Sequence, residues 1–417
     1  MRRMSRTAAR FCALALLLAA PGSRAELAAE PVGRVERLPS PPGRHWAFVS
    51  DLLNHRYALV DLDTSRFLGQ ISSGYLNSAA LFPRAKTEFY LVETYLSRGA
   101  RGERSDIVTI YDSATLLPIG EVLLPPRRAI NASPAGNAAL SDDDRFLAVF
   151  NQDPGTSLSI VDLAERRFAA EIPIAGCGCV YGAGPRRFVS LCQDGALLVV
   201  ALDERGRAAS VSRSAPFFDA ERDPVTEKAA RHGDHWLFAS FEGMLHPVDL
   251  SGPEPVFPGA WSLLSAEDRA QGYKIGGGQH LAVHEKRGLL YSLVHEGGEW
   301  SHKEPGSELW VYDLATRERV RQIALVSPGL TFMGRSLAFG QGWPWPLNRI
   351  SPALMGLLPP GISNVVVSQD DAPLLATSAD YSGSIALFDA LTGAHLRNVP
   401  TGNFTASSVH TPFGVDP

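Results

Sequence analysis

Hydrophobic and polar residues alternate in one phrase that recurs along the chain. Each copy is an alternating stretch that reaches an Asp, a short polar turn and a second alternating stretch, as in LWVYDLATRERVRQI. Alternation with a period of two is typical of half-buried β-strands. The phrase occurs seven times, and its shared acid stands at Asp61, Asp112, Asp162, Asp203, Asp249, Asp313 and Asp389.

The spacing of the seven acids predicts the fold. Successive acids are 51, 50, 41, 46, 64 and 76 residues apart. A repeat of about 40–50 residues with several strands in each unit is typical of a β-propeller, in which every unit forms one blade. We therefore predict an all-β, seven-bladed β-propeller that occupies residues 26–417 as a single domain. The last interval is long because it contains an additional segment at about 329–360.

The recurring acids are expected to be structural. An Asp followed by a polar turn can accept hydrogen bonds from backbone N–H groups and so hold a tight hairpin. In one turn Gly393 can supply a positive φ. Two further polar turns, Ser141–Leu147 and Ser368–Leu374, precede returning strands. The best helix signal is Ser265–Ala270, where Ser265 is the expected N-cap of a short helix within a loop.

The N-terminus has the pattern of a secretory signal. A basic segment precedes an apolar run, Phe11–Ala20, and the small-x-small sequence Ser23–Ala25 is a cleavage site. The apolar run is too short to span a bilayer. We predict a cleaved signal peptide over residues 1–25 and an exported mature chain.

Charge and composition narrow the range of partners. The formal net charge is −5, and no polybasic run is present. We therefore expect neither a nucleic-acid partner nor a membrane-binding surface. Hydrophobic residues make up 45% of the chain, beside 38 Gly and 30 Pro, which fits a large, loop-rich β domain.

Three cysteines lie outside the signal: Cys177, Cys179 and Cys192. In an oxidising compartment a disulfide is the expected state, with one thiol left over. The spacing alone leaves open whether Cys177 or Cys179 pairs with Cys192.

Motifs of a complete active site are missing. The sequence contains no Gly-x-Ser-x-Gly elbow, no His-Glu-x-x-His and no Walker loop. His280 and His284 lie in a predicted strand, and His232 and His235 lie in a polar loop. We expect these four to be surface or loop histidines and not metal ligands. The chain thus has the features of a scaffold or of one half of an enzyme.

Several segments resemble the heavy (large) subunit of methylamine dehydrogenase and aromatic amine dehydrogenase. They follow the family order along nearly the whole mature chain: Ser97–Asp106, Tyr111-Asp112, Thr115–Pro118, Gly176-Cys177, Cys192–Gly195, Phe217–Asp219, Trp261–Leu264, His302–Gly306 and Val367–Leu375. The arginine-rich segment and the His-Lys-x-Pro-Gly segment are specific, because a generic propeller does not need them.

The resemblance implies a seven-bladed propeller in a periplasmic heterotetramer of two heavy and two light subunits. In that family the light subunit carries tryptophan tryptophylquinone, and the heavy chain carries no cofactor, no metal and no catalytic residue. Primary amines are oxidised to aldehydes with release of ammonia. The electrons pass to a blue-copper protein such as amicyanin or azurin.

The resemblance also assigns individual residues. Gly74–Asn77 is similar to the segment whose aromatic residue lines the substrate channel, which makes Tyr75 the expected channel residue; the alternative is that Tyr75 packs at a blade edge. By the family pattern Cys177 pairs with Cys192, with a Cys179–Cys192 bridge as the alternative. Tyr273–Gln279 departs from the Trp-Arg-Pro-Gly-Gly-Trp-Gln run that is common in the family.

The segment at about 329–360 has no counterpart in the family pattern. It is rich in large apolar residues and is interrupted by five prolines. Our hypothesis is that it contacts the light subunit, the electron acceptor or another heavy chain. The alternative is a loop that folds over its own blade.

Two other function classes remain beside the amine dehydrogenase subunit. One is a propeller that diverged from the family and binds a partner without redox chemistry. The other is an independent propeller enzyme of the lactonase or pyrroloquinoline-quinone type, for which the repeated Trp docking motifs are missing.

Overall fold

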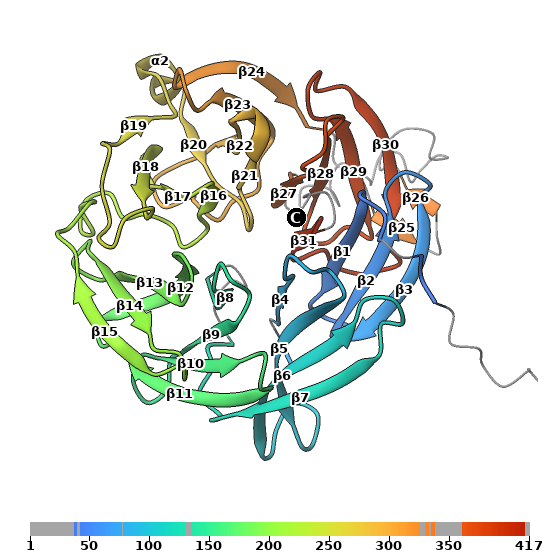
Figure 1. The fold of residues 1–417 in the computed structure, drawn as a ribbon. Helices are drawn as coiled ribbons and strands as arrows, with labels where there is room; N and C mark the ends of the chain where they lie inside the picture. The colour runs from blue at the N-terminus through green and yellow to red at the C-terminus, as the bar shows by residue number, and fades with distance from the viewer. Residues whose placement is uncertain are drawn as a thin grey trace, which may run out of the picture. The chain divides into compact units, whose positions relative to one another are not determined.

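Seven antiparallel sheets follow one another around a ring within the unit formed by residues 38–417 (Figure 1). The computed structural model describes residues 37–39, 42–76, 78–130, 136–325, 330–332, 335–337 and 361–412. Each sheet is one blade, and the predicted seven-bladed β-propeller is confirmed. The predicted signal peptide lies outside the described residues.

The blades are numbered here in chain order, and each begins with its innermost strand. Blade 2 contains β4 (Ala79–Leu81), β5 (Glu88–Leu96), β6 (Arg104–Asp112) and β7 (Pro118–Leu124). Blade 3 contains β8 (Ala138–Leu140), β9 (Phe146–Asn151), β10 (Ser157–Asp162) and β11 (Arg167–Pro173). Blade 4 contains β12 (Cys177–Gly182), β13 (Arg187–Cys192), β14 (Leu197–Leu202) and β15 (Ala208–Arg213).

The second half of the ring repeats this order. Blade 5 contains β16 (Ala230–His232), β17 (His235–Ala239), β18 (Met244–Asp249) and β19 (Trp261–Ser262). In blade 6, β20 (Tyr273–Ile275) and β21 (Leu281–His284) both pair with β22 (Leu289–Glu296), which is followed by β23 (Glu308–Asp313) and β24 (Glu318–Ala324). Blade 7 contains β27 (Asn364–Val367), β28 (Leu374–Ser378), β29 (Ser384–Asp389) and β30 (His395–Pro400).

Blade 1 closes the ring with strands from both ends of the described chain. The N-terminal strands β1 (Trp46–Asp51), β2 (Arg56–Asp61) and β3 (Arg66–Ser72) lack an inner strand of their own. The C-terminal strand β31 (Val409–His410) takes that place and pairs with β1, Val49 opposite Val409. The ring is therefore closed by one antiparallel sheet that combines strands from the N-terminal and C-terminal parts of the described chain.

All seven recurring acids hold turns, as predicted. Each lies at or directly after the end of the third strand of its blade, and one of its carboxylate oxygens accepts a backbone N–H from a residue two to four places onward. In Asp389, for example, Oδ1 accepts from Leu391 N at 2.9 Å and from Thr392 N at 2.7 Å. Gly393 follows with a φ of 78°, which confirms its expected role.

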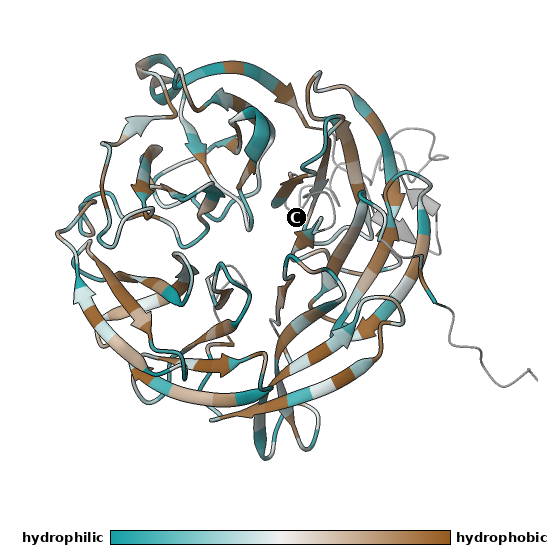
Figure 2. Ribbon diagram, in the orientation of Figure 1, coloured by the Kyte–Doolittle hydropathy of each residue, from teal (hydrophilic) through white to brown (hydrophobic). Residues whose placement is uncertain are grey.

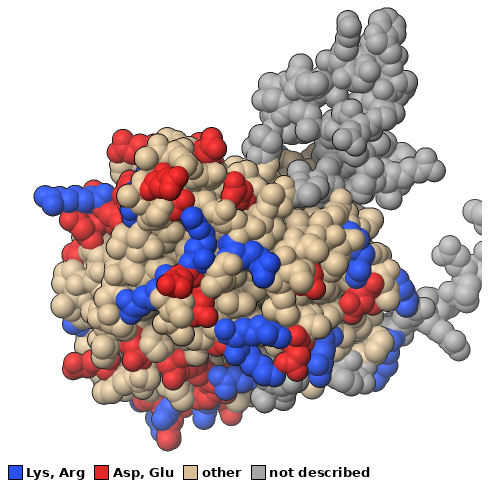
Figure 3. Space-filling model, turned by 90° about the horizontal axis from the view of Figure 1, so that it is seen from above, with Lys and Arg blue, Asp and Glu red and all other residues tan. Residues whose placement is uncertain are grey.

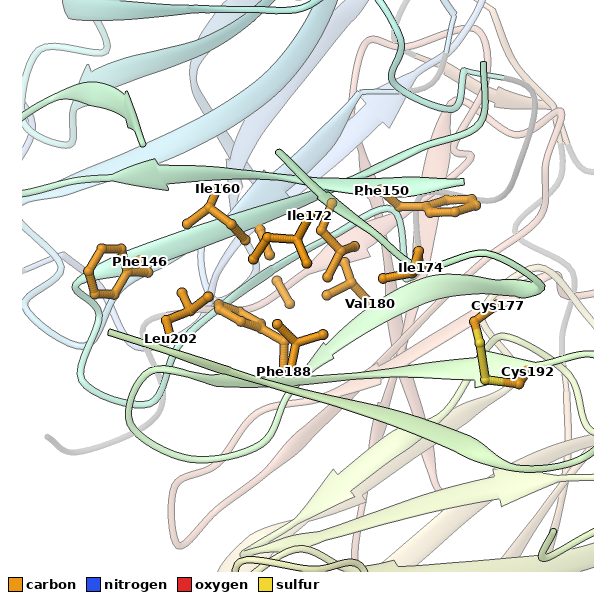
Figure 4. Close-up of a cluster of buried hydrophobic side chains, with 14 of the residues drawn as sticks. Phe146, Phe150, Ile160, Ile172, Ile174, Cys177, Val180, Phe188, Cys192 and Leu202 are labelled. Atoms are coloured by element: carbon orange, nitrogen blue, oxygen red, sulfur yellow. A yellow bond between two sulfur atoms is a disulfide. The ribbon is translucent and has the colours of Figure 1, made fainter. Parts of the chain in front are cut away.

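The cores lie between the blades. The described residues form seven clusters of buried apolar side chains, one between each pair of neighbouring blades. Figure 4 shows the cluster between blades 3 and 4, where Phe146 and Ile160 face Phe188. Both faces of an inner sheet are therefore apolar, while outer strands such as β15 are exposed and more polar (Figure 2).

The structure also tests the predicted helix, the two Ser turns and the additional segment. Helix α2 (Ala266–Ala270) begins after its N-cap Ser265, whose side chain accepts from Asp268 N in a capping box. Ser141 and Ser368 each accept the N–H of a returning strand, at 2.9 Å in both turns. Within the additional segment only a short hairpin is described, β25 (Leu330–Phe332) with β26 (Arg335–Leu337). The rest of that segment, and the hypothesis about its contacts, lie outside the described residues.

Candidate functional site

Strand direction divides the loops of the ring into two sets. Because neighbouring strands in a blade are antiparallel, the Asp turns lie at one end of the blades. The connections between blades, and the loops between second and third strands, lie at the opposite end. We call that end the Tyr75 face; it contains the loops 52–55, 73–78, 97–103, 193–196, 214–229, 240–243, 263–272, 297–307, 379–383 and 401–408.

Most segments that carry the family resemblance belong to the Tyr75 face. The arginine-rich loop, the Phe217–Asp219 segment and the His302–Gly306 segment all lie in its loops. The atypical run Tyr273–Gln279 lies in and beside β20 of blade 6. Three segments lie at the other end: Tyr111-Asp112 and Thr115–Pro118 belong to the Asp turn between β6 and β7, and Val367–Leu375 forms the turn between β27 and β28. Specific sequence is thus concentrated at one end of an otherwise repetitive scaffold.

Tyr75 lies on the connection between blades 1 and 2, and the backbone fixes its position. Its N–H donates to Thr94 O at 2.7 Å, and the N–H of Ser73 donates to His55 O at 2.7 Å. The Tyr75 ring is half-buried, with its centroid 5.6 Å from that of His55. Tyr75 therefore packs against a neighbouring turn and also reaches the surface of this face.

Gly74 is required for this arrangement. A Cβ atom at Gly74 would lie 2.6 Å from Thr94 O and 2.9 Å from Thr94 N, so any other residue would push the loop away from β5. The Gly74 N–H instead donates to Oε1 of Glu93 at 2.9 Å. A glycine immediately before the aromatic residue is thus explained by close backbone contact.

Glu93 is fully buried beneath this loop. Its Oε2 accepts from the Thr109 hydroxyl at 2.5 Å, and the Tyr95 hydroxyl donates to the same carboxylate. Burial raises the pKa of Glu93 to about 7, although the hydrogen bonds from Thr109 and Gly74 oppose the rise. A charged residue within the apolar strand EFYLVETYL was the available sequence signal, and sequence reasoning missed it.

A second buried acid lies beside Glu93 in blade 2. Asp106 has no exposed surface and accepts from Thr94 Oγ1 at 2.6 Å, from Arg104 Nε at 2.9 Å and from Arg128 N at 2.9 Å. Arg128 is also buried, and burial lowers its pKa to about 10 while Asp106 opposes that shift. The Arg104–Asp106 part of the arginine-rich segment therefore belongs to an ionic network around a fully buried Asp106, in which the Arg104 side chain is 25% exposed.

Cys177 and Cys192 are joined in a disulfide across β12 and β13, where they are direct cross-strand neighbours. The alternative Cys179–Cys192 bridge is not formed, and Cys179 remains a thiol. Burial raises the pKa of Cys179 to about 12, so the group stays protonated at neutral pH. This bridge stabilises the Tyr75-face end of blade 4 and leaves no reactive thiolate there.

The expectation for the histidines was wrong for two of the four. His280 and His284 are fully buried, because β21 is an inner strand covered by neighbouring blades. Burial lowers the pKa of His280 to about 3, and His284 is held by hydrogen bonds to Arg287 N and Asp370 O. Among the described residues no three His, Cys, Asp or Glu side chains are grouped as metal ligands.

Exposed aromatic side chains mark the Tyr75 face. Five aromatic residues in the described ranges are strongly exposed, and Trp300, Phe404, Tyr381 and Tyr95 belong to this end of the blades. Only Phe67, on β3, lies toward the Asp turns. Isolated exposed apolar residues are ordinary, but a concentration of aromatic rings at one end is typical of a contact surface. Sequence reasoning did not single out these four residues.

Charged side chains of one sign do not gather on the surface that Figure 3 shows. In Figure 3, Lys and Arg side chains are interspersed with Asp and Glu side chains. The described chain also has no helix with the length and apolar character needed to cross a membrane.

Comparison with known proteins decides the family. Residues 45–328 match the family described as methylamine dehydrogenase heavy chain. The chain belongs to this family. It is 24% identical over 342 residues to the methylamine dehydrogenase heavy chain of Methylophilus methylotrophus, covering 82% of this chain and 76% of that protein. It is 26% identical over 360 residues to the Methylorubrum extorquens heavy chain, covering 85% and 78%. The resemblance inferred from the sequence segments is confirmed.

More distant solved structures share the fold alone. Dihydro-heme d1 dehydrogenase NirN aligns with a TM-score of 0.52 at 19% identity, covering 98% of this chain and 87% of that one. A protein of unknown function from Desulfotomaculum acetoxidans aligns with a TM-score of 0.55 at 13% identity, covering 88% and 98%. Membership of the methylamine dehydrogenase heavy-chain family implies a light subunit as partner.

Proposed function

We propose that this chain is the heavy, non-quinone subunit of a periplasmic amine dehydrogenase. Two heavy and two light subunits form the enzyme, which oxidises primary amines to aldehydes and ammonia and passes electrons to a blue-copper protein. The tryptophan tryptophylquinone of the light subunit supplies the oxidising chemistry. The heavy chain contributes binding surface and the wall of the substrate channel.

The observation that supports this proposal best is the family match over residues 45–328. The position of the exposed aromatic residues adds a physical reason. Trp300, Phe404, Tyr381 and Tyr95 share one end of the blades with Tyr75, and a partner that covers them would bury several hundred Å² of apolar surface. In this proposal the light subunit binds at the Tyr75 face and Tyr75 lines the path of the amine.

The periplasmic location rests on the signal pattern of residues 1–25 and is also a proposal. A disulfide between Cys177 and Cys192 fits an oxidising compartment. The Cys179 thiol is partly buried and its raised pKa keeps it protonated, which disfavours thiol–disulfide exchange there.

Assembly with the light subunit tests this placement. The double variant Trp300→Ala/Phe404→Ala is expected to weaken binding at least about tenfold, because aromatic residues at the centre of an interface typically contribute most of its energy. Affinity is measured by titrating the purified chain with the light subunit of the same source. Phe67→Ala is the matched control, since Phe67 is similarly exposed, at 51%, but lies at the other end of the blades. Equal affinity for both variants would contradict the assignment of the Tyr75 face.

A further inference from the structure

A cavity of about 220 Å³ lies at the centre of the ring, beneath the Tyr75 face. Its wall comes from the innermost strands of blades 1, 2, 3, 5 and 6 and from the residues directly before them, so it surrounds the ring axis (Figure 1). These strands start at the Tyr75 face, which places the cavity near that end of the axis. Most of the wall consists of small or apolar residues, among them Ala79, Ala80, Leu81, Ala138, Ala229 and Leu281.

Lys228 brings an ammonium group to this wall. Its side chain is 5% exposed, and Nζ donates to Gly277 O at 2.9 Å. The Glu227 carboxylate lies 4.0 Å from Nζ, which is beyond hydrogen-bond distance. An ammonium group has three N–H donors, so two of them have no acceptor within the described part of the chain.

The electrostatic surroundings favour an anion next to Lys228. Burial lowers the pKa of the lysine; Glu227 and Asp380 oppose that shift, and the exposed Lys303 adds to it. Neither acid compensates the charge by direct contact, because Glu227 is 4.0 Å away and the Asp380 carboxylate is held by two other side chains. A buried charge without a hydrogen-bonded partner of opposite charge is costly. A bound anion would supply the missing acceptors.

The other polar side chains of the wall already have partners. The hydroxyl groups of Ser407 and Ser408 bond to that of a third serine in blade 1, at 2.8 and 2.9 Å. The Gln279 amide bonds to both the N–H and the carbonyl of Val409, and His410 Nε2 lies 3.2 Å from Ser408 Oγ. Burial lowers the pKa of His410 to about 4, so its ring is neutral near neutral pH. Lys228 is therefore the group that would recognise a charged ligand.

The size and chemistry of the wall select the class of anion. A cavity of about 150 Å³ holds benzene, so about 220 Å³ is enough for an anion of similar or slightly larger size. Apart from Lys228, a ligand meets mainly Ala and Leu side chains. Inorganic phosphate would place unpaired oxygen atoms against them, whereas an alkyl chain gains free energy from the same contact.

We propose that this axial cavity binds a short-chain carboxylate. The carboxylate group accepts hydrogen bonds from the Lys228 ammonium, and the alkyl chain contacts the Ala and Leu side chains of the wall. All of these groups belong to the heavy chain, so the inference does not rest on the proposed amine oxidation. In the proposed assembly the light subunit would lie over this end of the ring axis.

Equilibrium dialysis of the purified full-length chain with radiolabelled butyrate measures this binding directly. Competition by unlabelled acetate, propionate and butyrate should strengthen about fourfold for each added methylene group, because the alkyl chain is buried. Butanamide has the shape of butyrate without its charge and should compete at least about tenfold more weakly. Inorganic phosphate should also compete more weakly than butyrate, because the wall offers it few donors.

Lys228→Met removes the ammonium group and keeps the length of the side chain, so it should weaken butyrate binding at least about tenfold. Lys303→Met is the matched control, because Lys303 is an exposed lysine that acts on Lys228 but does not line the cavity. This control should bind butyrate like the wild type. Ala229→Leu keeps Lys228 and fills part of the cavity, and it should weaken binding at least about tenfold as well.

Circular dichroism shows whether each variant folds. If Lys228→Met does not fold, Ala229→Leu and the comparison of butyrate with butanamide on the wild type decide the question. Equal affinity of the wild type and Lys228→Met, equal competition by butyrate and butanamide, or unchanged binding in Ala229→Leu overturns the proposal. Stronger competition by phosphate than by butyrate, or the lack of saturable butyrate binding to the wild type, overturns it too. None of these results depends on the light subunit or on amine oxidation.

Discussion

Replacing Asp106 by alanine is expected to lower the free energy of unfolding by about 3–5 kcal/mol, because breaking a buried ion pair leaves its partner charge uncompensated. Asp106 is fully buried and accepts hydrogen bonds from Thr94, Arg104 and Arg128. Without the carboxylate, Arg104 loses its ion-pair partner, and the buried Arg128 guanidinium loses the negative charge that most opposes the lowering of its pKa. Chemical denaturation followed by circular dichroism measures the loss.

Asp371→Ala is the control for this experiment. Asp371 forms an ion pair with Lys286 at 2.5 Å, but the two side chains are 79% and 70% exposed. Water screens such a pair, so this variant should unfold close to wild type. The account of a buried network would be wrong if the two aspartate variants lost the same stability.

A chain that ends at Pro400 is expected to lose roughly 5 kcal/mol or more of stability, because ring closure requires β31. The truncation removes Val409, which is fully buried between blades 7 and 1. It also removes Phe404 N and Thr405 Oγ1, which donate to the buried carboxylate of Asp51 at 2.7 and 2.9 Å. Blade 1 would keep three strands and expose an inner edge.

Thermal unfolding and limited proteolysis of the two truncated chains measure this effect. A chain that ends at Pro412 keeps every contact of β31 in the described structure and should melt like the full chain. The chain that ends at Pro400 should melt far lower and be cut first in blade 1. Equal stability of both chains would contradict closure by β31.

The seven blades were predictable because each one repeats the same sequence pattern. Seven Asp residues at the ends of alternating strands predicted both the blade count and the hairpins, and Gly393 marked a left-handed position in one of them. Ring closure was not predictable, because β31 consists of two residues, too few to show periodicity. Its pairing with β1 depends on the closed ring and not on local sequence.

The candidate site was predictable only in part. Tyr75 came from the family resemblance, whereas Glu93 holds its loop from a strand that reads as apolar. His280 and His284 were expected at the surface because they are polar, but packing against neighbouring blades buries them. The local pattern of polar and apolar residues does not specify which blade covers a strand. That covering decides whether the side chains of the strand are buried. The exposed aromatic residues are a separate case, because single rings in loops carry no periodic signal.

The most direct test of the central claim is amine oxidation by the complex of this chain with its light subunit. The two chains are produced together with the quinone-forming enzymes of the same source. The visible spectrum of the purified complex is then recorded before and after a primary amine is added. The account predicts a quinone absorption band that bleaches on addition of amine, together with amine-dependent reduction of a dye. An assembled complex that shows the quinone band but neither bleaches nor reduces the dye with any primary amine would contradict it.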